Sequence, residues 1–184
     1  MFLVDATAFG PQVHAIHRVV PGLRADEAAL RAEAAFTVRR LDDAPDPADA
    51  LDALAGAGKG GTAFVLAGPD GRWLLTDPDP GALDSCLPAG TSPAWRALDV
   101  TVAHHLLIRT VWGLEDNEDV VWFRHDAASA EAAAAKHGGV ALLLNPTPVE
   151  AVIAVAAAGE RMPRKSTLFT PKPRSGLLIR PLDA

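Results

Sequence analysis

Residues 62–76, Thr-Ala-Phe-Val-Leu-Ala-Gly-Pro-Asp-Gly-Arg-Trp-Leu-Leu-Thr, indicate the kind of fold that this chain adopts. Two short apolar runs, residues 62–66 and 72–76, flank the sequence Gly68-Pro69-Asp70-Gly71. Gly, Pro and Asp between two such runs are a strong turn signal, because they adopt the backbone angles of a tight turn. The stretch therefore predicts a β-hairpin.

Short strands and helices alternate on both sides of the hairpin. Further strands are expected at residues 12–20, 37–41, 120–123 and 140–144, and helices at residues 24–36, 47–57, 93–112, 127–136 and 147–158. The alternation predicts an α/β fold with a mixed β-sheet and about five helices, and it leaves an α+β arrangement open. Residues 93–112 are apolar around much of the helix circumference and are expected to form a buried central helix. The continuous apolar run 140–144 predicts a strand buried on both faces.

The chain has 184 residues, a length that suits one domain over residues 1–184. Residues 77–92 are rich in Pro, Gly and Asp and are the best candidate for a boundary. A division there would give two lobes, 1–80 and 92–184, joined by this segment.

The composition predicts a cytoplasmic protein. The single cysteine, Cys86, rules out an internal disulfide framework and fits a reducing compartment. Neither a signal peptide nor a membrane span is expected, since no apolar run reaches the roughly 18 residues that a span needs. The net charge of −6 argues against nucleic acid as a partner.

Charge is distributed unevenly along the chain. Residues 161–184 contain six of the 17 Lys and Arg but one of the 23 Asp and Glu, so this part carries +5 and the rest −11. Such a separation indicates either an anion site or a tail that docks on the acidic body of its own chain.

The start of this basic part, residues 159–166, nearly matches the Walker A pattern, in which backbone amides wrap a phosphate. Arg164 replaces the second glycine of that pattern, and Pro163 removes an amide donor. A P-loop also follows a strand and opens a helix, whereas this segment follows a predicted helix. The segment is therefore not a P-loop.

A less specific anion site is the remaining functional interpretation. Its ligand-binding residues would be Arg164, Lys165, Ser166, Thr167 and Lys172, which offer charged and hydroxyl donors. From the residues alone, docking of a basic strand on an acidic surface is favoured over this site.

The histidines and the glycine-rich loop are weaker candidates. His104, near Asp99, is a candidate general base, although a histidine bonded to a neighbouring side chain is the favoured interpretation. The histidines lack the spacing of a zinc pair, so no metal site is expected. Residues 56–61 join a helix to a strand and are interpreted as a linker, and Cys86 as a spare thiol in a loop.

Several segments together carry a family resemblance. The tail, residues 159–172 followed by 175–179, resembles the C-terminal signature of an uncharacterised prokaryotic family catalogued as domain of unknown function 1015. Residues 17–20, 98–104 and 142–147 are similar to further segments of that family in the same order. These segments also make Arg18, Asp99 and His104 secondary site candidates.

The chain departs from the family in two ways. Leu168 and Thr170 stand where the family usually has tyrosine. Family members are also about twice as long, and their N-terminal half carries an Asp-Gly-His-His-Arg box similar to that of ParB-like proteins and of related kinases acting on free serine. His104-His105 does not replace the box, since no Asp-Gly precedes it and no Arg follows. The chain therefore resembles the C-terminal half, either as an excised piece or as a short member.

The resemblance implies two functions. In the first, this half supplies an anion site for a phosphorylated ligand in a phosphotransferase-like, kinase-like protein. The catalytic box then lies outside the chain, and a nucleotide with magnesium is the cofactor that would fit. In the second, the chain is a non-catalytic scaffold or interaction domain, with an exposed apolar patch where the N-terminal half packs. The expected partner is that half, and a homodimer stays open.

Overall fold

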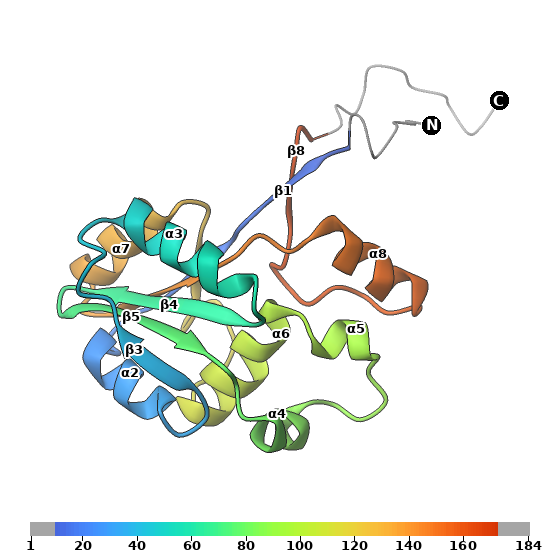
Figure 1. Cartoon of the computed structure of the whole chain (residues 1–184), viewed down its shortest axis with the longest axis horizontal. Helices are drawn as coiled ribbons and strands as arrows, with labels where there is room; N and C mark the ends of the chain where they lie inside the picture. Colours follow the sequence, from blue (N-terminus) through green and yellow to red (C-terminus); the bar gives the residue numbers. More distant parts are fainter. Residues whose placement is uncertain (1–9, 173–184) are drawn as a thin grey trace.

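The computed structural model describes residues 10–172, and its centre is a six-stranded sheet (Figure 1). The strand order is β3-β5-β4-β7-β2-β6. The strands are β2 (His17–Val20), β3 (Thr37–Arg40), β4 (Ala63–Gly68), β5 (Gly71–Thr76), β6 (Trp122–Arg124) and β7 (Val140–Leu144). The α/β class is confirmed. All neighbouring strands of this sheet pair antiparallel, so the expected mixture of parallel and antiparallel strands is wrong. Helices packed on an antiparallel sheet give the α+β arrangement, which the sequence left open.

The predicted hairpin is confirmed and forms β4 and β5. Gly68 pairs with Gly71, so Pro69 and Asp70 make the turn. Gly71 has φ of +136°, a backbone conformation that residues with a Cβ atom rarely adopt. The turn therefore requires glycine at this position, where β5 begins.

Helices cover both faces of the sheet. In Figure 1, α2 (Ala25–Ala32) lies on one face, and α3 (Pro47–Gly58) and α7 (Ala127–Lys136) lie on the other. Along β4, Phe64 and Leu66 pack into the core on the α2 side, whereas Val65 packs into the core on the α3 side. All five residues of β7 are buried, as expected for a strand covered on both faces.

The expected central helix is divided into three parts. They are α5 (Pro93–Arg96), α6 (Asp99–Val102) and the π-helix η1 (Ala103–Val111). Leu98 between α5 and α6 has extended backbone angles, φ −67° and ψ 130°, which end the first part. From α6 onward the helix is continuous and packs its buried side chains against the same core as α2. The Trp112 amide bonds to the Leu107 carbonyl five residues earlier, at 2.9 Å.

The segment 77–92 contains a helix, α4 (Pro80–Cys86), capped by Asp79. Leu83 and Cys86 pack against the core, so Cys86 is a helical residue and not a loop residue. Strands β2 and β4 precede this segment in the chain and β7 follows it, yet β7 lies between β4 and β2. The residues before and after the segment therefore build one sheet together.

A second, two-stranded sheet extends away from the body (Figure 1). It consists of β1 (Gln12–His14) and β8 (Leu168–Thr170), paired antiparallel; we call it the ribbon. The strand expected over residues 12–20 is thus two strands that pair with different partners. Extended chain was expected over 166–180; β8 lies within it, and residues 173–180 lie outside the described part.

One more helix, α8 (Val149–Ala157), lies on the same side of the body as the ribbon and contacts α5 (Figure 1). Pro148 is the N-cap of this helix and not its first residue, so the helix begins one residue later than the sequence predicts. Within residues 10–172, no helix has both the length and the apolar character needed to cross a bilayer.

Candidate functional site

Arg18, on β2, is the largest side chain that the body encloses completely, with 1% of its surface exposed. Its Nε donates to His104 Nε2 at 3.1 Å, its Nη2 to the Lys165 carbonyl at 2.9 Å, and its Nη1 to the Ile16 carbonyl. Burial lowers the pKa of the guanidinium to about 10, and the charge of Asp116 opposes this effect. Arg18 thus stays charged at neutral pH and joins the sheet, the central helix and residues 161–172, which we call the basic segment.

His104 continues the network toward the surface. Its Nδ1 lies 2.5 Å from Asp116 Oδ2, and Asp116 Oδ1 accepts from Arg164 Nη2 at 3.2 Å. Because Arg18 Nε can only donate, His104 Nε2 accepts, and the imidazole is neutral with its proton on Nδ1. Burial lowers the pKa of His104, and the hydrogen bond from His104 helps to lower the pKa of Asp116 to about 2.

This arrangement decides what His104 can do. Both ring nitrogens are engaged, so His104 positions Asp116 and Arg18 and has no free nitrogen for a substrate. Its carboxylate partner is Asp116, not Asp99, which lies in a separate cleft described below. The favoured interpretation, a histidine bonded to its neighbours, agrees with this geometry.

The basic segment docks on the body around Phe123 of β6. The guanidinium carbons of Arg18 and Arg164 lie 5.5 and 5.1 Å from the ring centroid, and Lys165 Nζ lies 5.8 Å from it. Arg164 also pairs with Glu118 at 3.3 Å. Cations this close to an aromatic face are attracted by its quadrupole.

Hydrogen bonds from other elements also hold the backbone of the basic segment. Lys165 has φ of +53°, and its carbonyl accepts from Arg18. Ser166 is buried, and its carbonyl accepts from Thr147 Oγ1 at 3.0 Å. Of the predicted anion-binding residues, Thr167 is half-buried and Lys172 is exposed. The structure thus brings Arg18, His104, Arg164 and Lys165 together.

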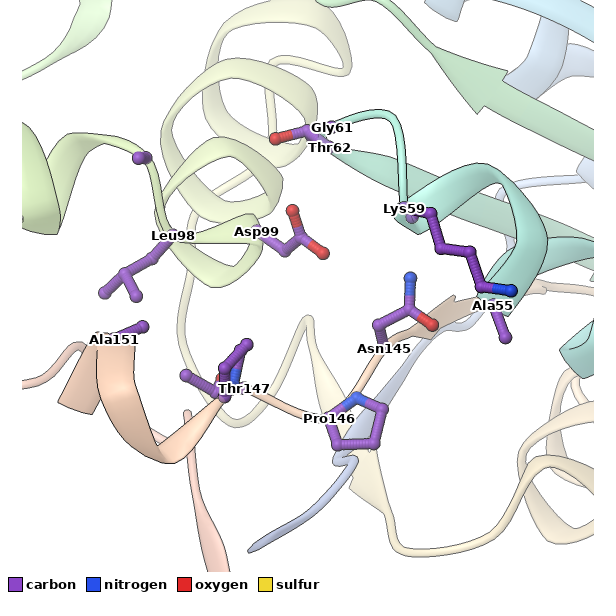
Figure 2. Close-up of a pocket in the computed structure, with 13 residues that line it drawn as sticks. Ala55, Lys59, Gly61, Thr62, Leu98, Asp99, Asn145, Pro146, Thr147 and Ala151 are labelled. Carbon is purple, nitrogen blue, oxygen red and sulfur yellow. The ribbon is translucent and has the colours of Figure 1, made fainter.

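Asp99 instead lines a cleft with a volume of about 470 Å³ (Figure 2). The other walls are the loop after α3, with Lys59 and Thr62, and the connection from β7 to α8, with Asn145 and Thr147. Burial raises the pKa of Asp99 to about 6, and a hydrogen bond with Thr62 opposes this rise. A carboxyl group with a raised pKa in a cleft is a typical functional-site feature.

The amide of Asn145 is fixed in this cleft. Its Nδ2 donates to the Leu54 carbonyl at 3.3 Å. A Cβ on Gly58 would lie 2.4 Å from Nδ2, so a larger residue there would require the amide to move. The stretch interpreted as a linker therefore forms a wall of the cleft.

Sequence reasoning misses Asp116, Lys59 and Asn145. A polar residue directly after a fully buried strand was an available signal for Asn145, because functional side chains gather at strand ends. Asp116 had no such signal, since it lies in an irregular stretch beyond the central helix.

The chain matches no family model, no curated protein and no solved structure. Within residues 10–172, no three His, Cys, Asp or Glu side chains are grouped so as to hold a metal ion.

Proposed function

We propose that this chain is an interaction domain whose docking face consists of α8 and the ribbon, and that its partner is the box-bearing N-terminal half that the family resemblance implies. The observation that carries the proposal is α8. Apart from Glu150, its residues are Val, Ile and Ala, yet Val155 is the one residue of the helix that is buried. Such an apolar helix, left largely uncovered, is typical of a surface that a second folded unit covers.

Ile153 shows this most clearly. Its side chain is 59% exposed, and the described part of the chain has one other large apolar residue this exposed, Leu30 on α2 at 67%. On a helix surface, neighbours lie three or four residues apart. For Leu30 three of these four positions are acidic, whereas for Ile153 three of the four are Val149, Ala156 and Ala157 and one is Glu150. Isolated exposed leucines are common, but a continuous apolar helix surface is not.

The ribbon supports the same face. Two strands are marginal in water without a third strand or a covering helix. Within the described residues, β1 and β8 pair with each other alone, and their residues are exposed or half-buried. A partner strand or helix would complete this small sheet.

The basic segment then has a structural role in the proposal. Arg18 and Thr147 hold the carbonyls of Lys165 and Ser166, and β8 follows directly. The contacts of Arg164 with Asp116 and Glu118 add two ion pairs at this point. The segment anchors the ribbon to the body, so a partner bound to the ribbon is positioned relative to the sheet.

The experiment replaces Ile153 by glutamate and uses Leu30→Glu as the matched control. The chain is co-expressed with the box-bearing half of a full-length relative, and the complex is measured by light scattering and calorimetry. We expect a one-to-one complex that Ile153→Glu weakens at least about tenfold, because one buried apolar anchor is worth about 1.4 kcal/mol or more. Leu30→Glu should leave it unchanged. A monomer that forms no complex, or equal effects of both variants, contradicts the proposal, and self-association would identify a second copy as the partner.

A phosphate-ligand site at the basic segment is the second candidate, and one observation favours it. Lys165 Nζ faces Phe123, and among the described residues no carboxylate lies within ion-pair distance of it. Its charge can therefore meet an anion brought by a ligand or by the box-bearing partner, and Thr167 and Lys172 lie nearby in sequence. Calorimetry with magnesium nucleotides and phosphorylated metabolites tests this. Binding should weaken in Lys165→Ala and not in Lys136→Ala, an exposed lysine on α7; the absence of binding would remove the idea for this chain.

A further inference from the structure

We infer that the cleft between Asp99, Asn145 and Lys59 is a binding site for a small ligand that carries both a primary ammonium group and an anionic group. This inference does not depend on the docking face. The cleft volume of about 470 Å³ lies within the range of small-molecule sites, roughly 300–1,000 Å³. Its walls come from three separate parts of the chain, which the sheet and central helix hold in place.

Asp99 supplies the position for the ammonium group. In Figure 2 its carboxylate points into the cleft, toward the side from which Asn145 projects. Within the described residues, Asp99 has no Lys, Arg or His within ion-pair distance, although burial works against its charge. Thr62 can satisfy one of several acceptor sites on the two carboxylate oxygens. A ligand cation would supply the missing counter-charge and further donors.

Asn145 makes the site selective for a donor. Its Nδ2 is held by the Leu54 carbonyl and by the close approach of Gly58, so the amide cannot rotate freely. In Figure 2 its Oδ1 lies on the side of the amide that faces away from Asp99, so it is a second, neutral acceptor on a different wall of the cleft. The N–H donors of a primary ammonium group are expected to bind the Asp99 carboxylate first.

Lys59 supplies the position for the anionic group. Lys59 and Asp99 are the two charged residues that line the cleft. In Figure 2 the exposed Lys59 side chain extends from the loop after α3 toward Ala55, away from Asp99, and its flexible stem allows its charge to meet an anionic group at the rim of the cleft. An anion without an ammonium group would meet the repulsion of Asp99, and an amine without an anion would leave Lys59 unused. The charges therefore fit a ligand with both groups.

Three probes separate these contributions: O-phosphoethanolamine, ethanolamine and inorganic phosphate. Each is titrated into the ¹⁵N-labelled chain at about pH 7.5, where Asp99 is ionised, and the amide signals of residues 59–62, 99, 145 and 147 are followed. We expect O-phosphoethanolamine to bind most tightly, ethanolamine to shift the same signals more weakly, and phosphate to leave them in place.

Two variants assign the contacts. Asp99→Asn keeps the shape and should weaken O-phosphoethanolamine at least about tenfold, the effect of one ion pair of about 1.4 kcal/mol. Lys59→Ala should lower the affinity for O-phosphoethanolamine to that for ethanolamine and leave ethanolamine unchanged. Lys136→Ala is the matched control on an exposed surface. The amide spectrum of each variant shows whether it is folded.

A lower pH gives an independent readout. At about pH 5 most of the Asp99 carboxyl is protonated, so the affinity for ethanolamine, whose own charge does not change over this range, should fall by roughly tenfold. Cleft signals that move with neither amine overturn the inference. So does equal binding by a folded Asp99→Asn variant, and so does phosphate binding as strong as that of O-phosphoethanolamine.

Discussion

Arg18 Nε donates to His104 Nε2 at 3.1 Å, although both residues lie in elements that contribute several side chains to the apolar core. Arginine is rarely enclosed unless it is paired. Here the pairing is complete, since within the described residues no buried side-chain nitrogen or oxygen lacks a partner. The contact joins β2 to the π-helix and, through Asp116 and Arg164, to the basic segment.

Replacing Arg18 by methionine should therefore destabilise the chain although methionine is apolar. The substitution leaves His104 Nε2 and the Lys165 carbonyl without their donor, and we expect a loss of roughly 2–4 kcal/mol in the free energy of unfolding. Urea denaturation measures it. Arg39→Met, at an exposed position on β3, should change stability by less than about 0.5 kcal/mol.

A second measurement separates this network from simple packing. The charge of Arg18 contributes to the lowered pKa of His104, so in Arg18→Met the His104 pKa should rise. Imidazole NMR signals followed against pH report the change. An unchanged stability together with an unchanged His104 titration would contradict the network.

His17 should make stability depend on pH. Burial and the charge of Arg18 lower its pKa from 6.5 to about 4, and its Nδ1 accepts from the Leu144 amide at 3.3 Å. Between these two pH values the unfolded chain binds a proton at His17 and the folded chain does not. The free energy of unfolding should thus fall by about 3 kcal/mol as the pH drops through this window.

The test compares the wild type with His17→Asn, which keeps an acceptor near the Leu144 amide. The difference in stability between the two should change by about this amount between pH 7 and pH 4. His14→Asn on the exposed β1 serves as the control and should leave the wild-type slope in place. A His17→Asn profile parallel to that of the wild type would show that His17 titrates normally.

Asp99 should change the free energy of unfolding with pH in the direction opposite to His17. Its pKa is raised from 3.8 to about 6, so between these values the folded chain holds the proton more tightly than the unfolded chain. Its ionised form therefore destabilises the fold above about pH 6, and this effect disappears as the pH falls below about 4. Asp99→Asn should be more stable than the wild type at neutral pH by up to about 2–3 kcal/mol, and equal to it near pH 4.

Thermal unfolding of the wild type and of Asp99→Asn at several pH values shows which of the two is more stable. Asp116→Asn provides the contrast, because the pKa of Asp116 is lowered to about 2 and its charge is favourable in the fold. Asp116→Asn should lose stability at neutral pH. If Asp99→Asn were less stable than the wild type at neutral pH, its carboxylate would have a partner that stabilises the charge.

The predictable parts of the fold are those encoded within a few neighbouring residues. The hairpin of β4 and β5 follows from four turn residues, and α7 has the bounds that its sequence predicts because Asp126 caps it. The buried strand β7 follows from five consecutive apolar residues. In each case the signal and the structure lie in the same short segment.

The interruption of the central helix and most of the cleft depend on residues far apart in sequence. Leu98 ends α5 although it is a good helix former, because tertiary packing outweighs its propensity. Asp99 and Asn145 lie far apart in sequence and line the same cleft only in the folded chain, which no local pattern encodes. The basic segment shows a related limit: its composition fits both an anion site and docking, and only its contacts with Asp116 and Glu118 reveal that it docks.

Gly58 and Gly56 lie two residues apart in α3 and should respond oppositely to alanine. A Cβ at Gly56 meets nothing within 4 Å, whereas a Cβ at Gly58 would lie 2.4 Å from Asn145 Nδ2. Gly56→Ala should stabilise the chain by about 0.5–1 kcal/mol, because alanine has the lower conformational entropy when unfolded. Gly58→Ala gains less than this at the helix end and must displace the amide of Asn145, which breaks its bond to Leu54.

We therefore expect the two variants to differ by about 1–3 kcal/mol in urea denaturation, with Gly58→Ala the less stable. The double variant Gly58→Ala, Asn145→Ala removes the amide that the new Cβ would meet, and should recover much of this difference if the close approach is its cause. Equal stabilities of Gly56→Ala and Gly58→Ala would mean that Asn145 moves aside without cost. The amide would then not be fixed, and the selectivity of the cleft for a hydrogen-bond donor would rest on Asp99 alone.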